Sequence, residues 1–234
     1  NLNINTIYLA EGIYSPSTNG EVFPLVWSNY VNLIGAGEEL SVLDAENSAN
    51  ILKFNYVDEA QINGITIMNG LTDDYGGGIY CQHSSPTLEN LTIHNNTAGS
   101  GGGIYCQHSS PSLENVTIKN NSASESGGGI RCWSSSPSLV SVTIYGNSAS
   151  YGGGIFCSLA SPSLENVTIY GNVASDYGGG ISCVSSNPSL VNCIMWNDSP
   201  QEIYFSDYSS SNSITIAYSD IQGGYAGIEI NNDD

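Results

Sequence analysis

Aromatic, amide and guanidinium side chains recur at a constant spacing in this sequence and are the first candidates for chemistry. They occupy the second and fourth positions after a repeated glycine triplet. Aromatic faces and amides bind neutral sugar rings through stacking and hydrogen bonds. We therefore expect a ligand-binding outer face made of Tyr80, Gln82, Tyr105, Gln107, Arg131, Trp133 and Phe156, with His83 and His108 stacked nearby as surface residues. Cross-strand aromatic packing is the simpler explanation of the same rows.

Acidic side chains gather just before the glycine triplets and are candidate metal ligands. They are Asp73, Asp74, Glu125 and Asp176. Stacked carboxylates repel one another unless they are screened or bridged, and calcium takes several oxygen ligands. However, Ser100 and Ser150 interrupt the row, so solvated acids are the expected state. The sequence therefore requires no cofactor and leaves calcium as an optional ligand.

The spacing of these side chains follows from an internal repeat. The glycine triplet recurs every 25 or 26 residues, beginning at Gly76, Gly101, Gly127, Gly152 and Gly178. A fixed period of about 25 residues indicates stacked supersecondary units. The adjacent glycines, a Ser-Ser-Pro turn and several β-branched residues disfavour helical units and favour short strands joined by turns.

Stacking such units predicts an all-β fold, a single-stranded parallel β-helix with about three short strands per coil. Side chains alternate between the two faces of a strand, so that Ile104 and Cys106 point inward while Tyr105 and Gln107 point outward. Equivalent residues then stack at the strand spacing of about 4.8 Å. Dividing the 234 residues by the period gives about nine coils around one hydrophobic core.

Several columns of equivalent residues are expected in the interior. Apolar columns fall at the positions of Ile104, Leu113 and Ile118. A polar column consists of Asn96, Asn121, Asn147 and Asn172, each of which can bond to the next coil while its own backbone takes a left-handed conformation. Five of the six cysteines stack at one inward position, Cys81, Cys106, Cys132, Cys157 and Cys183. Because their parallel side chains suit the disulfide torsion poorly, free buried thiols are expected.

We expect a single β-helix domain over residues 1–234. Residues 1–75 would form irregular N-terminal coils, residues 76–200 the regular repeats and residues 201–234 the C-terminal coils. No amphipathic segment covers the hydrophobic end at residue 1, which a solenoid generally needs for solubility. The chain is therefore expected to be a piece of a longer protein, and self-association through the coil ends is a further expectation.

Composition limits the partners. Three basic residues against 22 acidic ones give a net charge of −19. Nucleic acid and anionic membrane surfaces are excluded as partners, because binding either of them draws on clustered Lys and Arg. There is no apolar run of about 20 residues, so this segment is not expected to insert into a membrane. The acidic, polar composition with almost no lysine is typical of an extracellular protein.

The segment SPSLENVTIYGNVASDYGGGI at residues 161–181 resembles the right-handed parallel β-helix repeats of the pectin-lyase-like superfold. The chain is especially similar to secreted or surface-anchored bacterial repeat proteins, and more distantly to chlamydial polymorphic outer membrane proteins. Residues 189–224 resemble the closing coils of such proteins. The resemblance implies right-handed coils and a secreted or cell-surface location in a bacterium. It implies no particular activity, because one fold hosts many functions.

The same superfold includes pectate lyases, alginate lyases and polygalacturonases, which raises an enzymatic alternative. A uronate lyase needs a cation to neutralise the substrate carboxylate and a base, commonly Arg or Lys, to abstract the adjacent proton. Arg131 lies on a regular strand face and is the candidate catalytic residue, although a solvated arginine beside aromatic rings is the expected state. A polygalacturonase-like hydrolase would pair aspartates with a Gly-His-Gly motif, and Asp73 and Asp74 lack that companion.

The sequence favours a non-catalytic extracellular β-helix module for surface display, adhesion or carbohydrate contact, because the regular coils carry no convincing catalytic constellation. A calcium-dependent polysaccharide lyase or glycoside hydrolase is the alternative, with its site beside Arg131 or within residues 15–75. A self-assembling structural or filament component is the second alternative. The expected partners are accordingly a polysaccharide or glycan, or further copies of the chain.

Overall fold

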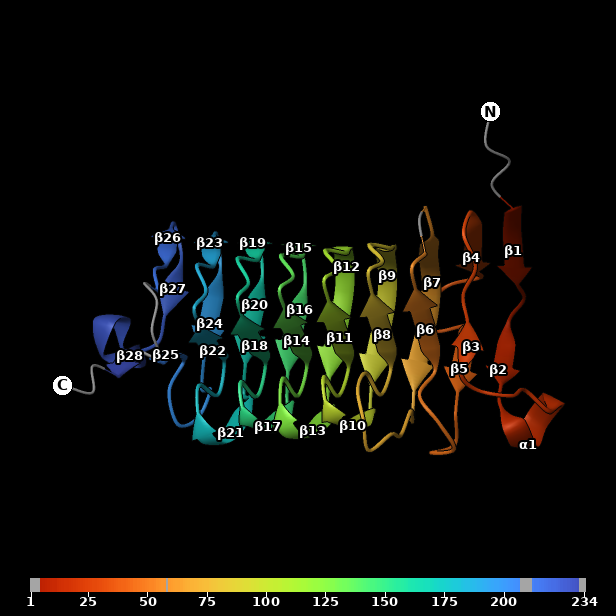
Figure 1. Cartoon of the computed structure of the whole chain (residues 1–234), viewed down its shortest axis with the longest axis horizontal. Helices are drawn as coiled ribbons and strands as arrows, with labels where there is room; N and C mark the ends of the chain where they lie inside the picture. The colour runs from red at the N-terminus through yellow and green to blue at the C-terminus, as the bar shows by residue number, and fades with distance from the viewer. Residues whose placement is uncertain (1–4, 58, 207–211, 232–234) are drawn as a thin grey trace.

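The computed structural model describes residues 5–57, 59–206 and 212–231. The chain forms a right-handed parallel β-solenoid whose coils stack along one axis, with β1 near one end and β28 near the other (Figure 1). Within the described ranges, no helix is long and apolar enough to cross a membrane.

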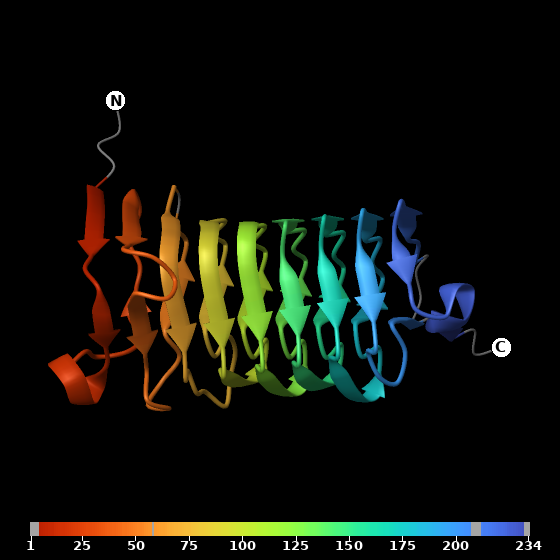
Figure 2. The same cartoon turned by 180° about the vertical axis from the view of Figure 1, so that it is seen from behind.

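The described residues form three parallel sheets that run along the axis. The nine-stranded sheet consists of β3 (Leu25–Val26), β6 (Leu52–Asn55), β8 (Ile79–Gln82), β11 (Ile104–Gln107), β14 (Ile130–Trp133), β18 (Ile155–Ser158), β22 (Ile181–Val184), β25 (Ile203–Ser206) and β28 (Ile228–Asn231). The fifteen-stranded sheet consists of β1 (Asn5–Leu9), β2 (Gly12–Tyr14), β4 (Val31–Gly35), β5 (Ser41–Asp44), β7 (Gln61–Met68), β9 (Thr87–His94), β12 (Ser112–Lys119), β15 (Ser138–Val140), β16 (Thr143–Tyr145), β19 (Ser163–Glu165), β20 (Thr168–Tyr170), β23 (Ser189–Val191), β24 (Ile194–Trp196), β26 (Thr215–Ala217) and β27 (Asp220–Ile221). The four-stranded sheet consists of β10 (Thr97–Ser100), β13 (Ser122–Ser126), β17 (Ser148–Tyr151) and β21 (Val173–Tyr177). In the part of the chain that the structure describes, two short helices, α1 (Pro16–Asn19) and η1 (Gly224–Gly227), lie at opposite ends of the solenoid, as Figure 2 shows.

The solenoid makes about eight turns, one fewer than the sequence predicts. The irregular coils are longer than the regular ones, because Leu25, Leu52 and Ile79 pair in register at intervals of 27 residues. In addition, β1 and β2 precede the first strand of the nine-stranded sheet, so residues 5–24 do not complete a further turn.

Equivalent residues pair across the coils in the predicted register. Ile104 pairs with Ile79 on one side and with Ile130 on the other. The apolar columns at the positions of Ile104, Leu113 and Ile118 are buried and belong to one hydrophobic core. The two-residue alternation in each strand is therefore enough to build this core, because every coil presents the same inward face to its neighbours.

A buried asparagine ladder connects consecutive coils, as predicted. Both the backbone N–H and the side-chain Nδ2 of Asn96 donate to Oδ1 of Asn121, each at 3.0 Å. The same pair of hydrogen bonds recurs at Asn121, Asn147 and Asn172. The prediction of a left-handed backbone at the ladder asparagines is wrong by one residue, since positive φ angles occur at Asn95, Asn120, Gly146 and Gly171. The left-handed turn therefore lies at the residue before each ladder asparagine, whose side-chain amide is buried in the core.

All six cysteines are free and buried, which confirms the prediction made from the parallel stacking of five of them. A hydrogen bond with Cys157, together with burial, raises the pKa of Cys132 well above its ordinary value. A neutral buried thiol supplies no thiolate, which is the reactive species.

We expect all six thiols to resist a thiol-specific alkylating reagent in the native protein and to react fully in guanidinium chloride. Mass spectrometry of the labelled protein measures this directly. Labelling of Cys132 under native conditions would contradict a closed interior column.

Candidate functional site

The nine-stranded sheet brings the predicted ligand-binding residues into two rows that run along the solenoid. One row contains Tyr80, Tyr105, Arg131 and Phe156, and the other contains Gln82, Gln107 and Trp133. Both rows have the register that the sequence predicts. Their exposure to solvent, however, differs sharply.

The first row is covered by the chain segment that precedes the glycine triplets. Tyr80 is only 9% exposed and Tyr105 only 1%. The ring of Tyr75 lies 4.6 Å from the ring of Tyr105, centroid to centroid, and 6.5 Å from that of Tyr80. Burial raises the pKa of Tyr105. The prediction that these two tyrosines form an open outer face is therefore wrong, because an outward-pointing side chain is exposed only where no other segment covers it.

Arg131 lies beside aromatic rings, as expected, but its side chain is half-buried and not freely solvated. Its guanidinium carbon lies 4.9 Å from the ring centroid of Phe156 and 5.8 Å from that of Tyr105. Nη1 donates to Oγ of Ser126, and Nε is buried without a hydrogen-bond partner.

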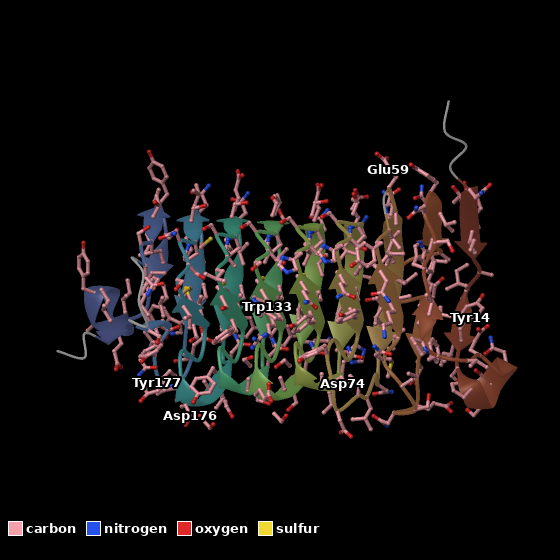
Figure 3. The ribbon with its side chains drawn as sticks, in the orientation of Figure 1. Tyr14, Glu59, Asp74, Trp133, Asp176 and Tyr177 are labelled. Carbon is pink, nitrogen blue, oxygen red and sulfur yellow. The ribbon has the colours of Figure 1, made fainter. Side chains whose placement is uncertain are left out.

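Trp133 of the second row also ends a line of exposed rings, which we call the ring row. Its members are Tyr56, His83, His108 and Trp133, and successive ring centroids are 4.7, 5.0 and 6.2 Å apart. Tyr56 is 67% exposed and Trp133 37% exposed. The expected stacking of the two histidines is confirmed. Figure 3 shows Trp133 midway along the solenoid.

Tyr56 is the member of the ring row that sequence reasoning missed. It follows Asn55 in the way that His83 follows Gln82, and the pairing of β6 with β8 places Asn55 opposite Gln82. Tyr56, His83 and His108 all have positive φ angles, so the chain turns in the same way after each strand. Aligning the irregular coil with the regular repeats would have revealed this position.

Two adjoining cavities lie beside the ring row, where the chain turns from the nine-stranded to the fifteen-stranded sheet. We call them together the turn groove. Their volumes are about 570 and about 470 Å³, and both are lined by Glu59 and Ser85. Tyr30, His83 and His108 also line the larger cavity, and Asn32, Gln61, Thr87 and Glu89 line the smaller one. Figure 3 places Glu59 at the edge of the solenoid where the coils turn.

The polar side chains in the smaller cavity are already ordered. Oε2 of Glu89 accepts hydrogen bonds from Nε2 of Gln61 and from Nδ2 of Asn63, each at 2.9 Å. A preorganised set of carboxylate and amide groups can bind several hydroxyl groups at once. The ring row and the turn groove therefore combine exposed aromatic rings with fixed polar groups.

The predicted metal ligands do not converge on one point. Asp73, Asp74, Glu125 and Asp176 are exposed, and Figure 3 shows Asp74 and Asp176 well apart along one edge. Ser100 and Ser150 occupy the intervening coils, so the acidic positions are about 10 Å apart, which is two strand spacings. Among the residues that the structure describes, no group of three or more His, Cys, Asp or Glu side chains could hold a metal ion. Calcium binding by this chain stays a prediction.

A buried carboxyl pair, Asp198 and Glu202, was not predicted. Burial, followed by the neighbouring carboxyl group of Glu202, raises the pKa of Asp198 to about 8. Burial also raises the pKa of Glu202. Both residues line a cavity of about 430 Å³ near the C-terminal end of the solenoid. The signal in the sequence was the aspartate itself, which takes the place of the ladder asparagine in the earlier repeats.

Comparisons with known proteins agree with this fold. No curated protein matches the chain. Among solved structures, pectate lyase Pel9A is similar with a TM-score of 0.62 and 16% identity over 92% of this chain and 69% of that chain. ORF18 of Geobacillus virus E2 is similar with a TM-score of 0.49 and 9% identity, over 92% of this chain and 51% of that chain. At 16% identity, the likeness to pectate lyase Pel9A shows a shared fold and nothing about activity.

The sequence matches the family model for the right-handed β-helix region over residues 37–149 and again over residues 77–234. The resemblance to pectin-lyase-like β-helices is thereby confirmed, and the chain belongs to the right-handed β-helix family.

Proposed function

We propose that this chain is a non-catalytic extracellular β-helix module that binds a neutral polysaccharide along the ring row and in the turn groove. The observation that supports this proposal is the continuous line of exposed rings from Tyr56 to Trp133, which runs beside ordered polar side chains. Sugar rings present apolar faces that stack on aromatic side chains and hydroxyl groups that bind carboxylates and amides.

The direction of the ring row suits a chain-like ligand. Its rings lie on successive coils, so an extended polysaccharide laid along the axis would contact several of them at once. The net charge of −19 favours a neutral polysaccharide over an acidic one, because an anionic chain would be repelled. Pectate lyase Pel9A, which shares the fold, acts on pectate, and this motivates a test for cleavage as well as for binding.

The test is retention of the protein on insoluble neutral glycans. We expect Trp133→Ala and Tyr56→Ala each to weaken retention about tenfold, which corresponds to the loss of one stacked ring. Tyr170→Ala is the matched control, because Tyr170 is also exposed and stacked on Tyr145, but on the fifteen-stranded sheet. Equal losses in all three variants would contradict a specific ring row.

The same glycans should be incubated with calcium or with a chelator while unsaturated products and new reducing ends are recorded. Calcium-dependent product that disappears in Arg131→Ala would replace this proposal with a polysaccharide lyase. No retention, combined with a light-scattering mass that rises with protein concentration, would favour the self-assembling component instead.

A further inference from the structure

The asparagine ladder ends on an aspartate. Oδ1 of Asp198 accepts from the backbone N–H of Asn172 at 2.7 Å and from its Nδ2 at 2.9 Å. These are the two hydrogen bonds that each earlier rung makes to an asparagine. Asp198 is therefore the last rung and is only 7% exposed.

The other side-chain oxygen of Asp198, Oδ2, takes the place of the Nδ2 group that donates a hydrogen bond in each earlier rung. In the earlier rungs Nδ2 also donates to the carbonyl group of an inward residue of the preceding coil, as from Asn172 to Ile144 at 3.1 Å. Ile169 pairs with Ile144 on the next coil, so the corresponding carbonyl group for Asp198 is that of Ile169. A carboxylate oxygen has no hydrogen to donate, and Oδ2 of Asp198 is buried without a hydrogen-bond partner. A protonated carboxyl group would supply the donor that asparagine supplies elsewhere.

Glu202 brings a second carboxyl group to the same place. It is only 4% exposed, and its Oε1 accepts from the backbone N–H of Asp198 at 3.3 Å. Its Oε2 is also buried without a hydrogen-bond partner. Two buried carboxylates repel each other, so ionising both costs free energy. If one of them keeps its proton, this repulsion is removed. The raised pKa values of both groups agree with this arrangement.

The ionisable groups on the surrounding elements offer no positive charge. They are Glu229 on β28, Asp220 on β27, Tyr177 on β21, Tyr204 on β25, Tyr225 in η1, and the thiols of Cys183 and Cys193. Glu229 accepts from Nε2 of Gln201, whose Oε1 accepts from the backbone N–H of Gly178. The basic residues Lys53, Lys119 and Arg131 all lie in earlier coils.

We propose that the Asp198–Glu202 pair is a proton-operated latch that holds the C-terminal coil, residues 198–206 and 212–231, on the rest of the solenoid. While Asp198 is neutral it behaves as a further ladder asparagine. Loss of the proton leaves two buried negative charges, and water enters through the adjoining cavity lined by Gln222, Gly223 and Gly227. The C-terminal coil then loosens while the earlier coils, whose rungs are amides, stay closed. This inference does not depend on the proposed glycan binding.

Hydrogen exchange followed by mass spectrometry tests the latch at about pH 6.5 and about pH 9, with rates corrected for intrinsic exchange. We expect protection of peptides within residues 194–206 and 212–231 to fall about tenfold at the higher pH, while a peptide over residues 104–118 is unchanged. Asp198→Asn should keep full protection at both pH values. Asp220→Asn, which changes an exposed aspartate of the same coil, should respond like the wild type.

The latch also predicts how the stability of the whole protein changes with pH. Asp198 holds a proton in the folded chain that it releases in the unfolded chain above its ordinary value of 3.8. The thermal midpoint of the wild type, relative to Asp198→Asn, should therefore fall as pH rises from about 4 to about 8 and level off above that.

Equal protection of the wild type at both pH values, or an equal loss in Asp198→Asn, would overturn the proposal. Infrared titration of the wild type is an independent check that needs no variant. A protonated carboxyl band that disappears near pH 8 is expected, and its absence at about pH 6 would contradict the latch.

Discussion

Replacing Asn147 by alanine is expected to lower the free energy of unfolding by about 4 kcal/mol. Its Oδ1 accepts from the backbone N–H and from Nδ2 of Asn121, and its own Nδ2 donates to Ile118 and to Asn172. Alanine leaves the backbone N–H of Asn121 without this acceptor and removes one hydrogen bond each from Nδ2 of Asn121, the carbonyl group of Ile118 and Oδ1 of Asn172. Each unsatisfied buried polar group costs about 1–3 kcal/mol, and each lost hydrogen bond adds about 1 kcal/mol. The ladder would be interrupted in the middle of the solenoid.

Denaturant unfolding followed by circular dichroism measures this loss. Asn166→Gly is the matched control, because Asn166 is an exposed stacked asparagine with a positive φ angle that glycine adopts easily. We expect that variant to change the stability by about 0.5 kcal/mol or less. A comparable loss in both variants would mean that burial of the amide is not what makes the ladder stabilising.

Replacing Gly128 by alanine is expected to cost about 3 kcal/mol or more. A Cβ atom at this position would lie closer than 3.0 Å to the backbone carbonyl oxygens of Ser148 and Gly153. Neither atom belongs to a flexible side chain, so the coils themselves would have to separate. The glycine triplet is therefore required by close backbone packing between coils.

Thermal unfolding of Gly128→Ala measures this effect. Gly171→Asn is the control, since Gly171 has a positive φ angle and open space around its Cα, and asparagine occupies the equivalent positions 95 and 120. We expect the control to keep its thermal midpoint. A normal midpoint in Gly128→Ala would show that the coils can separate cheaply, against the close packing described above.

Most of the fold was predictable because the repeat makes the pattern of one coil the pattern of all. The two-residue alternation around Ile104 identified the inward face, and the recurrence of the triplet identified which residues pair between coils. Coil number was overestimated because the period of the regular repeats does not hold before Ile79.

For the candidate site, the sequence predicted which residues pair between strands but not which of them are exposed to solvent. Gln107 and Trp133 pair as expected and remain at the surface. Tyr105 and Arg131 also point outward from the strand, yet Tyr75 and Phe156 cover them. Alternation along a strand tells which way a side chain points, but it does not tell which other segment lies on top of it.

Asp198, at the end of the asparagine ladder, shows most clearly what the sequence determines and what only the tertiary structure decides. The sequence by itself determined that Asp198 takes the place of an asparagine, because the period assigns every residue to a column. Only the tertiary structure decided that this aspartate is buried against Glu202 with no cation among the described residues around it. Column and register are properties of the order of residues, whereas exposure and protonation depend on which neighbours remove a group from water.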